Sequence, residues 1–277
     1  MIVVVGAGTL GVRVLRALPL NKEVTVIDHD IVQAKNVPVQ YPQEAVGMRK
    51  VDAVRALIRP DCTVYAKYLD YTTVGLLAEA DLVIDCTDTM VSRLLINDYC
   101  AQQGIPWVHG ALSDVAGTVA VFTPGKPCFR CIYGGNPGEL CTPALLPEIA
   151  DKTAYVVVQE AQTALAHAVH SIFVRVHAGA HVVLQPTFDP NCPTCHGEYP
   201  ALHPQESFYI TYCVNNNCMA AKPRARHDHD HGSPQLRTIQ GIPVQVFPNG
   251  ELHFLAEVDA DVLHSIAKRV YAERKNI

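Results

Sequence analysis

The chain begins with a short apolar strand that leads directly into a glycine-rich turn, and this feature constrains its fold more than any other. Residues 2–5 are all apolar and β-branched, which is typical of a buried parallel strand. A Gly-x-Gly-x-x-Gly pattern follows, and apolar residues then recur at helical spacing. We expect Gly6 to permit the tight turn, Gly8 to let a nucleotide approach the backbone, and Gly11 to let helix and strand pack closely. The pattern therefore predicts a nucleotide site in an α/β fold.

Residues 23–28 predict the next strand, which ends in an acid. Asp28 lies 20 residues after Gly8, at the spacing where Rossmann-type sites place a carboxylate that accepts hydrogen bonds from ribose hydroxyls. An aspartate that caps a loop or helix is the alternative. The polar segment after Asp28 would lie at the carboxyl edge of the sheet, where ligands bind in open α/β folds. Its polar candidates are His29, Asp30, Lys35, Asn36 and Gln40.

An amphipathic helix is expected to follow Gly47-Met48-Arg49 and to stop at Pro60. Lys50 would stand in its first turn, where the helix dipole disfavours a cation. A phosphate partner for Lys50 is therefore a reasonable hypothesis, and a solvated surface lysine is the alternative.

A strand over residues 81–86 would end at the same edge of the sheet. Asp88 then stands at the start of a helix, where it is either an N-cap or a ligand for Mg²⁺ beside the phosphates of a nucleotide. Arg93, about one helical turn further on, would orient or pair with that carboxylate.

The remaining pattern predicts a Rossmann-like, mostly parallel sheet with helices on both faces. Strands are expected at 63–66, 105–108 and 117–122, and a long alanine-rich helix from Glu148 to about Val176. We expect a nucleotide-binding domain over residues 1–200. Residues 201–277 would form a small appended α/β unit with a strand at 207–214, a His-rich loop at 224–233, a hairpin at 244–257 and a terminal helix.

Two Cys-x-x-Cys pairs stand about 60 residues apart, at Cys128 and Cys131 and at Cys192 and Cys195. Each pair can hold one metal ion through two thiolates, and together they complete the four-sulfur set of a structural zinc site. Four unrelated thiols are the alternative, which must explain two identical spacings. A redox dithiol is less favoured, because we expect neither pair to begin a helix after a strand.

Cys141 lies between the two pairs, in a stretch bordered by glycine and proline that we expect to be exposed and mobile. A covalent role and an incidental cysteine are both open from the sequence alone.

Composition excludes several other classes of protein. The net charge is −5 and no basic stripe is present, which argues against a nucleic-acid binder. No apolar run reaches the roughly 18–20 residues that span a bilayer, and no signal peptide is expected ahead of the first strand. Ten cysteines without a secretion signal indicate a reducing compartment, so we expect a cytoplasmic protein.

Taken in order, these motifs resemble the ThiF/MoeB/HesA family, the bacterial relatives of ubiquitin-activating enzymes. The resemblance runs from Ile2 to about Gly197 and depends on the order and spacing of all the motifs together. They are the glycine turn, Ile27-Asp28-His29-Asp30-Ile31-Val32 with Asn36 and Gln40, Gly47-Met48-Arg49-Lys50, Cys86-Thr87-Asp88 with Arg93 and Asn97, and the paired cysteines.

The resemblance implies ATP-dependent adenylation of a C-terminal carboxylate, commonly the Gly-Gly end of a ubiquitin-like or sulfur-carrier protein, by a homodimer. It implies that Asp28 binds the ribose, that Lys50 contacts the triphosphate and Asn36 helps to position it. It also implies that Asp88 binds Mg²⁺ and is most needed for chemistry. In some relatives a cysteine in the region of Cys141 then takes the acyl group or carries sulfur. The nucleotide-binding set that it implies is Gly6, Gly8, Gly11, Asp28, Asp30, Asn36, Gln40, Arg49 and Lys50.

The chain also departs from the family. Members usually have an arginine that clamps phosphates just before the residue matching Gln40, and Val39 stands there instead. Arg49 is a candidate to compensate. Two alternatives to the adenylating enzyme therefore stay open. One is a degenerate member that binds nucleotide and scaffolds an active partner. The other, more remote, is an NAD-dependent oxidoreductase, for which the glycine turn and Asp28 are the only support.

Overall fold

The computed structural model describes most of the chain, and its described residues divide into two compact units. One unit extends as far as Leu202, and the other takes the residues from His203 on. The described ranges are 1–19, 21–113, 116–125, 127–134, 147–166, 172–177, 180–204, 208–213, 218–223, 234–248, 250–256 and 258–274.

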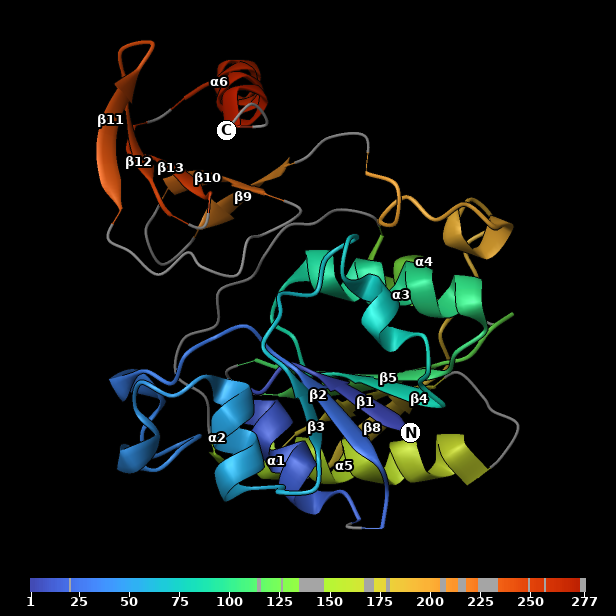
Figure 1. Cartoon of the computed structure of the whole chain (residues 1–277). Helices are drawn as coiled ribbons and strands as arrows, with labels where there is room; N and C mark the ends of the chain where they lie inside the picture. The colour runs from blue at the N-terminus through green and yellow to red at the C-terminus, as the bar shows by residue number, and fades with distance from the viewer. Residues whose placement is uncertain are drawn as a thin grey trace. The chain divides into compact units, whose positions relative to one another are not determined.

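An eight-stranded sheet in the order β3-β2-β1-β4-β5-β6-β7-β8 forms the centre of the first unit (Figure 1). The strands from β3 to β5 run parallel, and β6, β7 and β8 continue the sheet in antiparallel fashion. The strands are β1 (Ile2–Val5), β2 (Val24–Ile27), β3 (Thr63–Tyr65), β4 (Leu82–Asp85), β5 (Trp107–Leu112), β6 (Gly117–Phe122), β7 (Ile172–Val176) and β8 (His181–Leu184).

Helices cover both faces of this sheet, with α1, α2 and α5 on one side and α3 and α4 on the other (Figure 1). The α-helices described in this unit are α1 (Thr9–Ala17), α2 (Lys50–Leu57), α3 (Met90–Gln103), α4 (Phe129–Tyr133) and α5 (Pro147–Ala166). Short 3₁₀ helices are η1 (Ala34–Asn36), η2 (Gln43–Ala45), η3 (Val74–Leu77) and η4 (Thr194–His196). None of the described helices has the length and apolarity that crossing a membrane requires.

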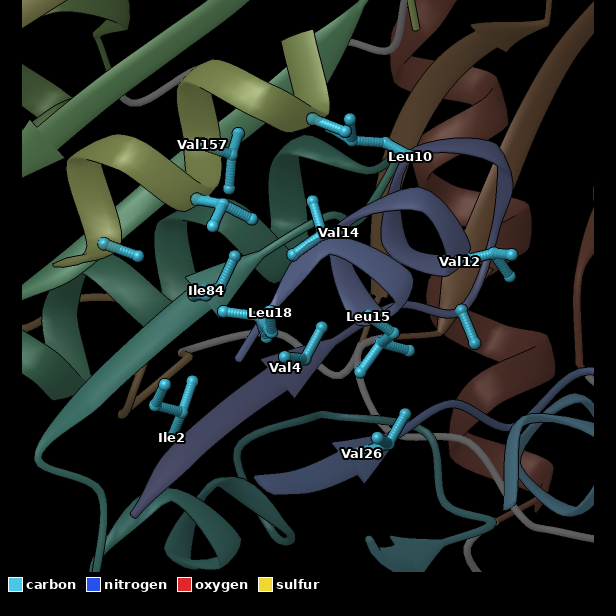
Figure 2. Packing of buried hydrophobic residues seen from close by; sticks show 14 of the residues in the cluster. Ile2, Val4, Leu10, Val12, Val14, Leu15, Leu18, Val26, Ile84 and Val157 are labelled. Atoms are coloured by element: carbon cyan, nitrogen blue, oxygen red, sulfur yellow. The ribbon is translucent and has the colours of Figure 1, made fainter. Parts of the chain in front are cut away.

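The strand side chains alternate between two apolar cores, one on each face of the sheet. In β1, Val4 packs with α1 and α5, whereas Val3 and Val5 pack with α3 on the opposite face. Figure 2 shows the first core, where Leu10, Val14 and Leu18 lie over Ile2, Val4, Val26 and Ile84 and meet Val157. Both faces are buried because helices cover both, which is why the parallel strands are continuously apolar rather than alternating.

The order of the strands creates a topological switch point at β1. The chain moves outward from β1 to β2 and β3 in one direction and to β4 and β5 in the other. In open parallel sheets a crevice forms at such a point, outside the carboxyl ends of the strands. The glycine turn follows β1 directly, so the fold places it at this crevice.

The second unit is a five-stranded antiparallel sheet in the order β11-β12-β13-β10-β9, covered by one helix. Leu263, Ile266 and Tyr271 of the helix pack on an apolar sheet face that includes Leu252 and Phe254. The elements are β9 (Phe208–Cys213), β10 (Cys218–Pro223), β11 (Gln235–Ile239), β12 (Ile242–Val246), β13 (Leu252–Phe254) and α6 (Ala260–Arg274).

The predicted fold class is confirmed: the sheet is mixed and mostly parallel, and helices cover both faces. The prediction of one helix from Glu148 to about Val176 was wrong at its end. Helix α5 ends at Ala166, and Ile172–Val176 is strand β7, paired with β6. Ile172, Val174 and Val176 are buried while Arg175 between them is exposed, which is the two-residue period of a strand.

Candidate functional site

The glycine turn between β1 and α1 has no room for side chains at two of its three glycines. A Cβ on Gly6 would come within 2.7 Å of the Cys86 carbonyl oxygen, and one on Gly11 within 1.9 Å of the Gly6 oxygen. Gly6 also has φ +95°, a conformation that L side chains rarely adopt. Around Gly8, in contrast, a Cβ would meet nothing within 4 Å, so this face of the turn is open.

The N-terminus of α1 is free to bind an anion. Gly8 is its N-cap and so provides no side-chain hydrogen bond, and the first turn contains no acid. The first N–H groups of a helix have no partner within it, and the helix dipole adds positive potential there. A helix that begins at a glycine-rich turn is therefore suited to bind a phosphate.

Asp28 follows β2 and is hydrogen-bonded to the turn itself. Its carboxylate accepts hydrogen bonds from the backbone N–H of Ala7 at 2.6 Å and of Asp30 at 2.7 Å. Burial raises the pKa of Asp28, and the neighbouring Lys50 charge offsets part of that increase. The side chain predicted to bind ribose therefore lies directly beside the glycine turn.

Lys50 is the first residue of α2 and is buried among carboxylates. Its Nζ donates to Asp30 Oδ2 at 2.7 Å. Burial lowers the pKa of Lys50, but the charges of Asp28, Asp30 and Asp88 together outweigh burial and raise that pKa overall. The lysine is thus a retained cation at the centre of the site rather than the solvated surface residue of the alternative interpretation.

The segment that follows η1 is bound to the glycine turn by two consecutive side chains. Gln40 donates from Nε2 to Thr9 Oγ1 at 2.9 Å, and its Oε1 is buried with no hydrogen-bond partner among the described residues. Tyr41, fully buried, donates its hydroxyl to the Ala7 carbonyl oxygen at 2.7 Å.

Asn36 is also buried, but its Oδ1 accepts from the backbone N–H of Gln33 and caps η1.

Tyr41 is a residue that the sequence interpretation missed. Its only sequence signal is an aromatic residue next to Gln40 in an otherwise polar, proline-rich segment. Arg49, predicted to be near the phosphates, is the exposed N-cap of α2.

Asp88 is an exposed side chain at the carboxyl end of β4, and the alternative that it caps α3 was wrong. Thr89 is the N-cap, and its hydroxyl oxygen accepts from the backbone N–H of Ser92 at 3.1 Å. Among the described residues, none forms a hydrogen bond or ion pair with the Asp88 carboxylate, and Arg93 instead donates to the Thr87 carbonyl oxygen at 2.8 Å. The expected pairing of Arg93 with Asp88 is therefore not made, and Asp88 is available to a ligand.

The buried pair of Asp85 and His109, which the sequence interpretation missed, holds the turn that precedes Asp88. Asp85 Oδ2 lies 2.7 Å from His109 Nδ1, and both residues are buried. The other oxygen, Oδ1, accepts from both the backbone N–H and the hydroxyl of Thr87, at 2.9 and 2.6 Å. Burial lowers the pKa of His109, and its hydrogen bond to Asp85 opposes that effect. The pair fixes the backbone immediately before Asp88.

The four paired cysteines come together in one cluster. Sγ of Cys128 lies 3.5 Å from that of Cys192 and 3.9 Å from that of Cys131, and Cys131 lies 3.5 Å from Cys195. A tetrahedral Zn²⁺ with Zn–S bonds of about 2.3 Å needs S···S separations of about 3.8 Å. The donor set and its spacing therefore fit zinc.

One part of the sequence argument on these cysteines was wrong. Cys128 is the N-cap of α4 and so does begin a short helix after β6. The convergence of all four sulfurs, rather than the absence of a helix, is what separates this site from a redox dithiol.

A buried polar network attaches the cysteine cluster to α3. Asp98 accepts from Arg130 Nη2 at 2.9 Å and from Thr194 Oγ1 at 2.6 Å, and Arg130 Nε also donates to Thr194. Asn97 accepts from the Phe129 N–H at 2.9 Å. Arg130 and Thr194 each lie inside one Cys-x-x-Cys pair, so the network joins both pairs to one helix.

Cys141 and His227, His229 and His231 of the His-rich loop lie outside the described residues.

Comparison with known proteins adds to this geometry. The profile of the ThiF family matches residues 1–188. A SAMP-activating enzyme E1 of Haloferax volcanii is 34% identical over 160 residues, which cover 54% of this chain and 57% of that protein. The molybdopterin-synthase adenylyltransferase of Escherichia coli K12 is 34% identical over 150 residues, covering 49% and 60%. Both matches thus span less than two thirds of the relative.

Among solved structures, E. coli MccB with ATP has the same fold. Its TM-score is 0.58 at 16% identity, with 70% of this chain and 66% of that chain covered.

Proposed function

This chain belongs to the ThiF family, and on that premise we propose that it uses ATP to adenylate the C-terminal carboxylate of a ubiquitin-like or sulfur-carrier protein. The names of its curated relatives, which are activating enzymes and adenylyltransferases, support the proposal. The observation that carries it is the convergence of the glycine turn, Asp28, Lys50 and Asp88 at the carboxyl ends of adjacent strands.

In the proposed reaction, a carboxylate oxygen of the carrier attacks the α-phosphorus of ATP. The bond from that phosphorus to its bridging oxygen breaks, pyrophosphate leaves, and the carrier becomes an acyl-adenylate. Two negatively charged groups must approach each other, so the site must supply positive charge in a fixed geometry. The open N-terminus of α1 and the buried Lys50 ammonium supply it from this chain.

Asp28 and Asp88 have different parts in this proposal. Asp28, held beside Ala7, would accept hydrogen bonds from the ribose hydroxyls. Asp88, exposed and fixed by the Asp85 turn, would hold Mg²⁺. When bound, Mg²⁺ would neutralise charge on the phosphates and so assist attack.

Pyrophosphate exchange tests the proposal most directly. The full chain, ATP, Mg²⁺ and a carrier ending in Gly-Gly that is encoded beside it should exchange labelled pyrophosphate into ATP. Asp88→Ala should abolish the exchange. Asp81→Ala, which changes an exposed acid just before the start of the same strand, is the matched control and should retain it. Full exchange by Asp88→Ala would contradict the role assigned to Asp88.

A scaffold protein that binds ATP without adenylation is the second candidate. Val39 favours it, because this exposed apolar side chain stands where the family usually has an arginine. Tight ATP binding by the chain, combined with no exchange in the presence of that carrier, would select this candidate.

We also propose that Cys128, Cys131, Cys192 and Cys195 hold one structural Zn²⁺, whose function would be to crosslink two distant segments. Metal analysis of the purified chain should give one zinc per chain. A chain that is folded and metal-free after purification without chelators would contradict this.

Cys141 is proposed to receive the acyl group. Its thiolate would attack the carbonyl carbon of the acyl-adenylate, release AMP and leave a thioester. On a gel run without reducing agent, we expect a band with the combined mass of the chain and the carrier. This band should disappear on treatment with thiol and should be absent for Cys141→Ser. We further expect a homodimer in the cytoplasm. The seven cysteines of the first unit form no disulfide with one another, which fits a reducing compartment. Light scattering checks the dimer.

A further inference from the structure

We propose that Arg13 of α1 is the second cation of the nucleotide site and contacts the terminal phosphates of ATP. This inference rests on the proposed function and adds to it a binding residue outside every motif considered above.

The Arg13 guanidinium lies between the first turn of α1 and the segment bound to it. Nη1 donates to the carbonyl oxygens of Thr9 at 2.9 Å and Val39 at 3.3 Å. Nε donates to Asp151 of α5 at 2.6 Å. Nη2 makes no hydrogen bond within the described part of the chain. The side chain is therefore held in place beside the glycine turn with donors remaining.

The charge balance of the site calls for another cation. Lys50 interacts with three carboxylates, those of Asp28, Asp30 and Asp88, so these four groups carry a net negative charge. ATP adds several more negative charges. One lysine that is already hydrogen-bonded to Asp30 does not balance them, even with one divalent ion.

The loop next to the turn holds no cation against it. No lysine or arginine occurs between Lys35 and Arg49, and within the described part of the chain neither of these two side chains hydrogen-bonds to the glycine turn. Among the described residues, Arg13 is the cation that hydrogen-bonds both to the first turn of α1 and to residue 39. Arg13 thus lies next to residue 39, where this chain has a valine and the family usually has an arginine.

The ion pair of Arg13 with Asp151 leaves its guanidinium available to a phosphate. Arg13 is the fifth residue of α1, and its guanidinium reaches back to the first turn of the helix. Its acidic partner Asp151 is 68% exposed, whereas the Arg13 side chain is 13% exposed. An ion pair with so exposed a partner contributes little and exchanges readily. A planar guanidinium with spare donors is the group best suited to bind phosphate oxygens.

Calorimetric titration of the full chain with Mg²⁺-ATP and with AMP tests the inference. Arg13→Gln should weaken ATP binding by about tenfold to a hundredfold, the range for one lost charge-assisted hydrogen bond or two. AMP affinity should change by less than about twofold, because AMP lacks the terminal phosphates. Arg16→Gln, an exposed arginine one turn further along α1, is the matched control and should bind both nucleotides as the native chain does.

The outcomes separate the inference from the proposed function. If the native chain binds ATP and Arg13→Gln binds it equally well, Arg13 has no such role while the function stands. If the native chain binds no ATP, both fail. If Arg13→Gln does not fold, Arg13→Lys and Asp151→Asn replace it: the first should weaken ATP binding in part and the second should leave it equal or tighter, with AMP binding unchanged in both. Equal ATP affinity for native chain and Arg13→Lys would then count against the inference.

Discussion

The glycine turn and the cysteine cluster lie in the same unit but are held together by opposite means. The turn is a backbone structure made by residues close in sequence. Among the described residues, the first N–H groups of α1 have no side-chain cap and Oε1 of the adjoining Gln40 has no hydrogen-bond partner. The cluster is a side-chain structure made by two distant segments, and its supporting residues Asp98 and Arg130 hydrogen-bond to each other. Spare polar groups favour ligand binding, whereas a satisfied network favours stability.

This contrast predicts which measurement each substitution should change. Substitutions at the cluster should lower the stability of the chain, and substitutions around the turn should lower nucleotide affinity unless they disturb the backbone.

The largest effect is expected from Cys192→Ser. It removes one ligand from a buried four-sulfur set, and since a structural metal stabilises the folded state through its own binding energy, the midpoint of thermal unfolding should fall by 10 °C or more, on the order of several kcal/mol. Metal content should fall with it. Cys62→Ser, a buried thiol outside the cluster, is the control and should retain the metal. An unchanged midpoint would show that the cluster does not stabilise the fold.

The second prediction separates the roles of two glycines in the turn. Gly11→Ala should destabilise the chain by about 3 kcal/mol, because its methyl group would lie within 1.9 Å of the Gly6 carbonyl oxygen and the helix would have to move from β1. Gly8→Ala has open space and a normal backbone, so stability should be retained while ATP affinity falls. Chemical denaturation and nucleotide titration of both variants check this. Equal stability losses would contradict the division of roles among the glycines.

The buried Asp85–His109 pair should give the third effect, a dependence of stability on pH. Burial lowers the folded-state pKa of His109 below the ordinary value of 6.5, so below pH 6.5 the unfolded chain binds a proton that the folded chain does not. The His109 contribution is therefore present above pH 6.5 and is lost as the pH falls from 6.5 toward the lower folded-state value.

His109→Gln should remove that part of the pH dependence, and urea unfolding between pH 5 and pH 8 measures it. His177→Gln, an exposed histidine after β7, is the control and should leave the pH profile as in the native chain. Identical profiles for the native chain and His109→Gln would show that the histidine does not titrate differently on folding.

The same contrast explains how much could be predicted from the sequence. The turn is local, so the spacing of Gly6, Gly8 and Gly11 and of Asp28 was enough to predict the strands, the helix and the edge of the sheet. The cysteine pairs were recognisable because their spacing repeats.

What the sequence did not reveal depends on contacts between distant segments. Tyr41, His109 and Arg13 act through residues 24 to 138 positions away, and no local pattern marks them. The alanine-rich pattern of α5 extends the predicted helix into strand β7, whose pairing with β6 is non-local and leaves no local signal. Because the ThiF family profile matches residues 1–188, the glycine turn and Asp28 are accounted for by that family and no longer favour an oxidoreductase.

The smallest expected effect comes from Tyr41→Phe, which tests whether the turn depends on its neighbours at all. The hydroxyl donates one buried hydrogen bond to the Ala7 carbonyl oxygen, so its removal should cost about 1 kcal/mol of unfolding free energy. Because Ala7 also donates to Asp28, loosening this bond should weaken ATP binding slightly as well. Tyr65→Phe, an exposed tyrosine in β3, is the control and should change neither quantity. If Tyr41→Phe matches the native chain in both measurements, the glycine turn is fixed by its own backbone, and the contrast with the cysteine cluster becomes sharper.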